Sequence, residues 1–121
     1  MSGIDNILYD KSYSFALRII KAYKYLINEK KEFILSKQVL MSGTSIGAMV
    51  REAKFAQSRP DFINKLSIGL KEANETLYWI ELLHDSEYID DEYFESIHED
   101  CNEIVAILVS IVKSSKGMDK S

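Results

Sequence analysis

Residues 60–84 read PDFINKLSIGLKEANETLYWIELLH, and this stretch sets the fold class of the 121-residue chain. A set of mostly apolar residues recurs along it at alternating spacings of three and four: Ile63, Leu66, Leu70, Ala73, Leu77, Ile80 and His84. Side chains at these spacings lie on one face of an α-helix, whereas a strand would alternate every second residue. The chain's single proline, Pro60, stands at the start, where its missing N–H costs a helix nothing. The stretch therefore predicts a long amphipathic helix.

The same spacing recurs outward from this helix on both sides. It predicts further helices over about residues 9–30, 37–58 and 91–115, beside the one over about 60–84. Ser36 and either Asp90 or Asp91 are in position to cap two of them, and Ser58 or Arg59 precedes Pro60 at the start of a third. Short connections make consecutive helices antiparallel, so we predict an all-α, up-down-up-down antiparallel four-helix bundle. Residues 1–121 form one domain in this prediction, and the small polar tail 116–121 frays.

The overall charge is weakly negative but unevenly distributed. Residues 1–60 hold ten Lys or Arg and five acids, 10 − 5 = +5, and residues 61–121 hold five Lys and fourteen acids, 5 − 14 = −9, which together give the net charge of −4. The lone Cys101 excludes an intrachain disulfide, which fits a reducing cytoplasm. The N-terminus lacks the pattern of a signal peptide, and the longest apolar run, 104–109, is far too short to cross a membrane. We therefore expect a cytoplasmic protein.

Two features of the predicted helices exceed what a lone bundle requires. Gly43 and Gly47 lie four apart inside the second helix, where each glycine costs about 1 kcal/mol relative to alanine. We interpret them as a site of close helix packing, because a phosphate loop would need a preceding strand and a Gly-Lys-Ser/Thr sequence. On the last helix the spacing predicts a core stripe at Ile97, Cys101, Ile104, Leu108 and Ile111. Val105, Val109 and Val112 form a second apolar stripe beside it. They are candidates for an oligomer interface, and the alternative is a broad core face.

The strongest candidate for metal chemistry is a pair of Glu-x-x-His sequences, at Glu81–His84 and Glu95–His98. Bundles that hold two metal ions use two such sequences plus one Glu from each remaining helix. The matching levels of the first two helices offer Lys37 and Gln38 and no inward carboxylate. The sequence therefore predicts no metal site, no cofactor and no catalytic residue.

Basic residues on the first helix are the candidates for binding a ligand. Lys11, Arg18, Lys21 and Lys24 carry positive charge away from the apolar stripe, and Lys30, Lys31 and Lys37 extend it along the chain. Such a face is either ordinary solvated surface or a contact for a phosphate backbone. We take Lys11, Arg18, Lys21 and Lys24 as the candidate nucleic-acid-binding residues.

Three segments together resemble a known family. They are LSKQVLMSGTSIGAMVREA (35–53), QSRPDFI (57–63) and KEANETLYW (71–79). With them the chain resembles, over roughly residues 9–113, the bacterial four-helix-bundle proteins encoded in intervening sequences of 23S rRNA genes. A more distant similarity connects this family to the accessory proteins of diversity-generating retroelements, which form a basic pentameric barrel that works with a reverse transcriptase and RNA.

The resemblance implies a small cytoplasmic bacterial protein without established enzymatic activity, which often assembles into a homopentamer. Combined with the basic first half of the chain, it leads us to expect a non-enzymatic homo-oligomer that binds structured RNA or an RNA-processing partner. The alternative is a scaffold that binds only proteins. Separately, the opposite charges of the two halves could serve assembly in a head-to-tail ring, one helix pair facing the other pair of a neighbouring copy, which would leave less of the positive charge for RNA.

Overall fold

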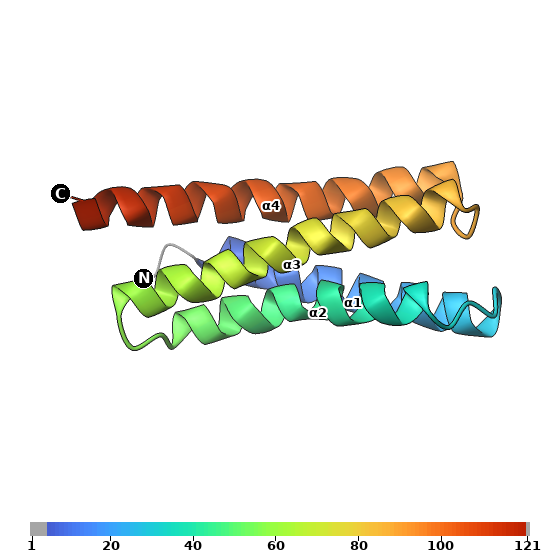
Figure 1. The fold of residues 1–121 in the computed structure, drawn as a ribbon, viewed down its shortest axis with the longest axis horizontal. Coiled ribbons are helices and arrows are strands. Elements are labelled where there is room, and N and C mark those ends of the chain that lie inside the picture. The colour runs from blue at the N-terminus through green and yellow to red at the C-terminus, as the bar shows by residue number, and fades with distance from the viewer. Residues whose placement is uncertain (1–4, 121) are drawn as a thin grey trace.

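The computed structural model describes the backbone of residues 5–120 and the side chains of residues 7–117. The chain forms α1 (Asp5–Asn28), α2 (Leu35–Lys54), α3 (Arg59–Asp85) and α4 (Asp91–Lys120), with no strand among the described residues. Consecutive helices run antiparallel and pack as a four-helix bundle, as Figure 1 shows. The predicted fold class is confirmed. No described helix has an apolar stretch of the length and hydropathy that a membrane span requires.

The helix boundaries differ from the prediction at several ends. α1 begins at Asp5, ahead of the expected residue 9, and α2 ends at Lys54, ahead of the expected residue 58. α4 continues through the predicted tail to Lys120, while residue 121 lies outside the described residues. One glycine costs a helix only about 1 kcal/mol, so Gly117 does not end α4.

Two of the predicted caps are confirmed and one is wrong. Ser58 accepts a hydrogen bond from the N–H of Asp61 (3.2 Å), and Asp90 accepts one from the N–H of Tyr93 (2.8 Å). At α2 the cap is the Glu32 carboxylate, which accepts from the N–H groups of Ile34, Leu35 and Ser36 at 3.2, 3.0 and 2.7 Å. Burial raises the pKa of Glu32, but these N–H donors outweigh it and the pKa lies below its ordinary value. Ser36 itself is buried and donates to the Glu32 carbonyl.

The core keeps the predicted spacing, but some of the buried residues are shifted by one position along α3 and at the end of α4. On α3 the buried stripe is Phe62, Leu66, Gly69, Ala73, Thr76, Ile80 and Leu83, while Ile63, Leu70, Leu77 and His84 are half-buried. α3 packs against both α2 and α4, so its predicted stripe is partly covered by these neighbours. The neighbouring stripe, which begins at Phe62, faces the bundle axis and is fully buried. On α4 the predicted stripe holds through Leu108, and only its last position moves one residue along the chain, so that Val112 is 7% exposed and Ile111 is half-buried. Val112 therefore belongs to the core of one chain, and its assignment to an outer stripe was wrong.

α2 packs closely against α1 at its two glycines. A Cβ at Gly43 would stand 2.8 Å from Cγ1 of Ile19, and one at Gly47 would stand 3.4 Å from the backbone oxygen of Ser12. The first distance is shorter than any real Cβ contact, and the second is at the edge of ordinary contact. Gly43 thus leaves room for a β-branched side chain of α1, and Gly47 leaves room for its backbone.

Candidate functional site

The contact between α1 and α4, which we call the α1–α4 seam, is the least extensive of the four between neighbouring helices. Charged pairs bridge it. Lys11 Nζ lies 2.7 Å from Glu103 Oε2, and Arg18 Nη1 lies 2.6 Å from Asp100 Oδ2. Glu103, which accepts a hydrogen bond from Lys11 and attracts its charge, raises the pKa of Lys11. Two of the four candidate nucleic-acid-binding residues are thus paired with carboxylates of their own chain.

The other two candidates, Lys21 and Lys24, are exposed on the C-terminal half of α1. Lys30 and Lys31 follow in the α1–α2 connection, and Lys37 lies in the first turns of α2. All five side chains are exposed, and none makes an ion pair with a described residue. We call this group the lysine strip: Lys21, Lys24, Lys30, Lys31 and Lys37.

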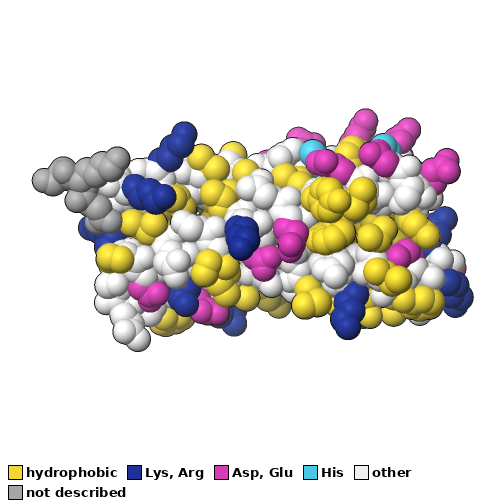
Figure 2. Space-filling view, in the orientation of Figure 1, with side chains coloured by type: hydrophobic (Ala, Val, Ile, Leu, Met, Phe, Trp, Pro, Cys, Tyr) yellow, Lys and Arg dark blue, Asp and Glu magenta, His cyan; other side chains and the backbone are white. Residues whose placement is uncertain are grey.

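Further charged groups lie at the two ends of the bundle. At the end where α2 finishes, Arg51 donates a hydrogen bond to the Tyr9 hydroxyl, and the Arg51 and Lys54 cations both lie 5.4 Å from the Tyr9 ring centroid. At the opposite end, acidic side chains gather with two histidines over α3 and α4, and Lys and Arg side chains lie over α1 and α2, as Figure 2 shows. The lysine strip therefore shares its end of the molecule with an acidic face on the other helix pair.

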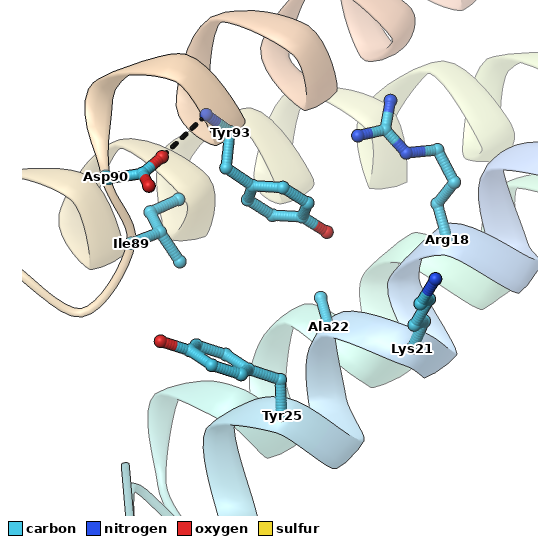
Figure 3. Close-up of a pocket in the computed structure, with 7 residues that line it drawn as sticks. All are labelled: Arg18, Lys21, Ala22, Tyr25, Ile89, Asp90 and Tyr93. Carbon is cyan, nitrogen blue, oxygen red and sulfur yellow. Dashed lines mark hydrogen bonds between the residues drawn. The ribbon is translucent and has the colours of Figure 1, made fainter. Parts of the chain in front are cut away.

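A cleft of about 490 Å³ opens between α1 and the beginning of α4. We call it the α1–α4 cleft, and Figure 3 shows its lining residues: Arg18, Lys21, Ala22, Tyr25, Ile89, Asp90 and Tyr93. The Arg18 guanidinium lies 5.5 Å from the centroid of the Tyr93 ring. Burial raises the pKa of Tyr93 and the nearby Arg18 opposes this, with a net increase, so the hydroxyl stays protonated at neutral pH.

Sequence reasoning missed the two tyrosines of this cleft. Tyr25 lies outside the apolar stripe of α1, and in the structure its side chain is 44% exposed, so it is not a core residue. Tyr93 stands in the first turn of α4, one helix turn before the first core position, Ile97. Both could have been found by asking which aromatic residues lie at the α1–α4 boundary of an up-down bundle.

The histidines lie where the two Glu-x-x-His sequences meet. His98 Nε2 is 3.0 Å from Glu81 Oε2, and His84 Nε2 is 2.6 Å from Asp91 Oδ1. The Phe94 ring lies between the two histidines, with centroids 4.1 Å from His84 and 4.9 Å from His98. Each histidine therefore has its own carboxylate, and no three potential ligands gather into a metal-binding group within the described part of the chain.

Cys101 lies in the core. Its side chain is 0% exposed, with Sγ 3.5 Å from the backbone oxygen of Ala73. Burial, with a smaller contribution from Asp100, raises the pKa of this thiol to about 12. A neutral and inaccessible thiol is a packing residue, as expected for a cysteine on a helix seam.

The fold and site thus define a four-helix bundle with three extensive helix contacts, a less extensive α1–α4 seam and an exposed strip of lysines. Residues 4–110 match the family model for the 23S rRNA-intervening sequence protein. The match spans most of the chain, so this chain belongs to the 23S rRNA-intervening sequence protein family, as the resemblance predicted.

A solved structure agrees with this assignment. A crystal structure of a protein of unknown function from the S23 ribosomal protein family, from Bacteroides thetaiotaomicron, is 62% identical in sequence with a TM-score of 0.90. The similarity covers 91% of this chain and 98% of that one. No curated protein matches this chain at a significant level.

Proposed function

We propose that this protein is a non-enzymatic, homo-oligomeric RNA-binding bundle that contacts the phosphate backbone through the lysine strip. The observation that carries this proposal is the exposure of five lysines without an ion pair to any described residue, along one continuous part of the chain. Phosphate contacts from such lysines supply affinity without requiring base recognition. Membership in a family encoded within 23S rRNA genes makes structured RNA the anionic partner of choice.

The paired residues have a different role in this proposal. Lys11 and Arg18 attach α1 to α4, and the carboxylates of Glu103 and Asp100 already neutralise them. Lys21 and Lys24 remain phosphate contacts, joined by Lys30, Lys31 and Lys37. A non-enzymatic role agrees with the buried Cys101, whose neutral thiol cannot attack a substrate.

Self-association is the second part of the proposal, and the pentamer is the state that the family resemblance implies. Large apolar side chains are exposed on the outer sides of α1 and α2: Tyr13 is 56%, Leu17 53% and Met41 57% exposed. Their exposure suits a contact with a second copy better than the half-buried Val105 and Val109 do. In a ring the lysine strip would repeat once per subunit, so weak contacts would act together.

A filter-binding titration with a hairpin RNA of the intervening-sequence type tests the RNA contact. We expect binding that weakens steeply with salt, and a smaller salt dependence in the triple variant Lys21→Gln, Lys24→Gln, Lys31→Gln. Each lost phosphate contact should reduce the slope of log K against log salt by roughly one. The matched control is the triple variant Lys71→Gln, Lys113→Gln, Lys116→Gln, which removes three exposed lysines from α3 and α4.

The outcomes separate RNA binding from the scaffold alternative. No binding at about 50 mM salt, or equal losses in the two sets of variants, would overturn the RNA contact. A protein partner retained by the triple variant would support a scaffold. Light scattering on the wild type and on Leu17→Glu tests assembly, and a monomeric wild type would refute it.

A further inference from the structure

The α1–α4 cleft has the size and composition of a small-ligand site. Its volume of about 490 Å³ falls within the range of ~300–1,000 Å³ that is usual for such sites. It opens where the C-terminal half of α1 passes the first turn of α4, and Figure 3 shows the side chains from both helices around one space. Of the lysine strip, Lys21 lines this space, and the proposed backbone contact makes no use of the aromatic and apolar lining.

The walls of the cleft are suited to a flat, apolar ring. Tyr25 and Tyr93 contribute aromatic faces, and Ala22 and Ile89 line the space beside them. A small apolar void lies below, lined by Ile19, Leu26 and Ile97 among others, so this side of the cleft adjoins the core. Tyr25 is 44% exposed and is therefore reachable from solvent. Aromatic side chains of this kind stack on nucleobases irrespective of sequence.

The polar groups of the cleft favour an anion attached to that ring. Arg18 is fixed by its pairing with Asp100 and its position over Tyr93. Lys21 is exposed, has no ion pair with a described residue, and lies on the same helix one turn before Tyr25. Lys30 follows Tyr25 in the sequence, and its ammonium lies 5.9 Å from the Tyr25 ring centroid. The exposed tyrosine therefore has one lysine before it and one after it in the chain.

One acceptor completes the set. Asp90 Oδ1 accepts a hydrogen bond from the N–H of Tyr93 and caps α4. Its second carboxylate oxygen, Oδ2, makes no hydrogen bond to the described residues. A carboxylate oxygen without a partner can accept a hydrogen bond from the exocyclic amino group of a nucleobase. Adenine, guanine and cytosine carry such an amino group, and uracil does not.

We propose that the α1–α4 cleft binds one unstacked nucleotide, with the base against Tyr25 and Tyr93 and the phosphate at Lys21. In its RNA form this inference rests on the proposed function, because the lysine strip continues from Lys21 and would guide the neighbouring phosphates. The same chemistry, a flat heterocycle carrying a phosphate, also occurs in a free mononucleotide. The experiment separates the two sources.

The test measures binding of AMP, CMP, UMP, inorganic phosphate and a short single-stranded RNA by calorimetry. Tyr25→Ala should weaken both nucleotide and RNA binding by roughly tenfold or more, as loss of base stacking does. Tyr25→Phe should restore it, and Tyr78→Ala, which removes a 54% exposed tyrosine of α3 outside the cleft, should change little. Unchanged thermal unfolding of Tyr25→Ala would show that the loss is local.

Specificity supplies a second measurement. AMP and CMP should bind more tightly than UMP, and Asp90→Asn should reduce that preference while it keeps a good N-cap residue at α4. Inorganic phosphate should bind more weakly than any nucleotide, since it lacks the ring.

Each outcome decides between the proposals. RNA binding that depends on the lysine strip but is equal in wild type and Tyr25→Ala would overturn the cleft and leave the proposed function standing. Nucleotide binding that Tyr25→Ala weakens, without any binding of RNA, would support the cleft as a mononucleotide site and overturn the proposed function. Phosphate binding as tight as nucleotide binding would overturn the cleft.

Discussion

The two sides of α1 are built differently. Toward α2, Gly43 and Gly47 let the helices approach until side chain and backbone touch. Toward α4, the contact is the least extensive of the four and is bridged by Lys11–Glu103 and Arg18–Asp100, with a cleft of about 490 Å³ beside them. The α2 side stabilises the bundle through dense packing, whereas the α4 side leaves polar groups and space for a ligand. Dense packing therefore lies on one side of α1, and the proposed binding site lies on the other.

The largest expected effect concerns Cys101, which lies in the contact between α3 and α4. A thiol with a pKa of about 12 instead of 9.0 holds roughly a thousandfold less thiolate at pH 8, and burial adds to this protection. The rate of reaction with Ellman's reagent should therefore be at least ~10³-fold lower in the native protein than in urea. The exposed thiol of a Cys101→Ala, Ser110→Cys variant should react rapidly. Comparable native and unfolded rates would mean that the α3–α4 contact opens as readily as the α1–α4 seam.

The second effect tests the glycines. Gly43→Ala places a Cβ 2.8 Å from Ile19 Cγ1, and we expect a net loss of about 1–2 kcal/mol in the free energy of unfolding, overpacking exceeding the gain in helix propensity. Gly47→Ala meets Ser12 at 3.4 Å and should gain up to ~1 kcal/mol from helix propensity. Urea unfolding followed by circular dichroism measures both. Opposite signs are expected, and equal losses would contradict the close approach at Gly43.

The smallest effect concerns the polar side of α1. A double-mutant cycle with Arg18→Met and Asp100→Asn should give a coupling energy below about 1 kcal/mol, because both side chains are partly exposed, 32% and 43%. The coupling should decrease as salt is added. A coupling of several kcal/mol that is insensitive to salt would contradict a loosely held α1–α4 seam.

Periodicity alone predicted the four helices, because spacings of three and four require only local geometry. It predicted Ile97, Cys101, Ile104 and Leu108 as core of α4, and all four are buried. It placed Ile111 in the core stripe and Val112 outside it, whereas Val112 is buried and Ile111 half-buried, because neighbouring positions near the end of a stripe differ only in how far the helix is rotated. That rotation depends on packing against α1 and α3, which no local spacing contains.

The site was less predictable than the fold for a similar reason. Lys11 and Arg18 look like free charges in the sequence, and only the adjacency of α1 and α4 brings Glu103 and Asp100 within 2.7 and 2.6 Å of them. The Glu32 cap was missed because Glu32 precedes the first residue of α2 by three positions. Its carboxylate accepts the hydrogen bonds that were expected to go to the Ser36 side chain. The cleft was missed because a cavity depends on where two helices diverge.

The weakness of the α1–α4 seam also concerns how the chain folds and opens. The three extensive contacts all join helices that are consecutive in sequence, while the α1–α4 seam joins the first helix to the last. Such a topology has a low contact order, so we expect rapid folding through helical hairpins, with the seam closing late. In the native state the same seam should be the first to open in hydrogen exchange. The α1–α4 cleft, which lies beside this seam, would then be able to widen while the other three contacts remain packed.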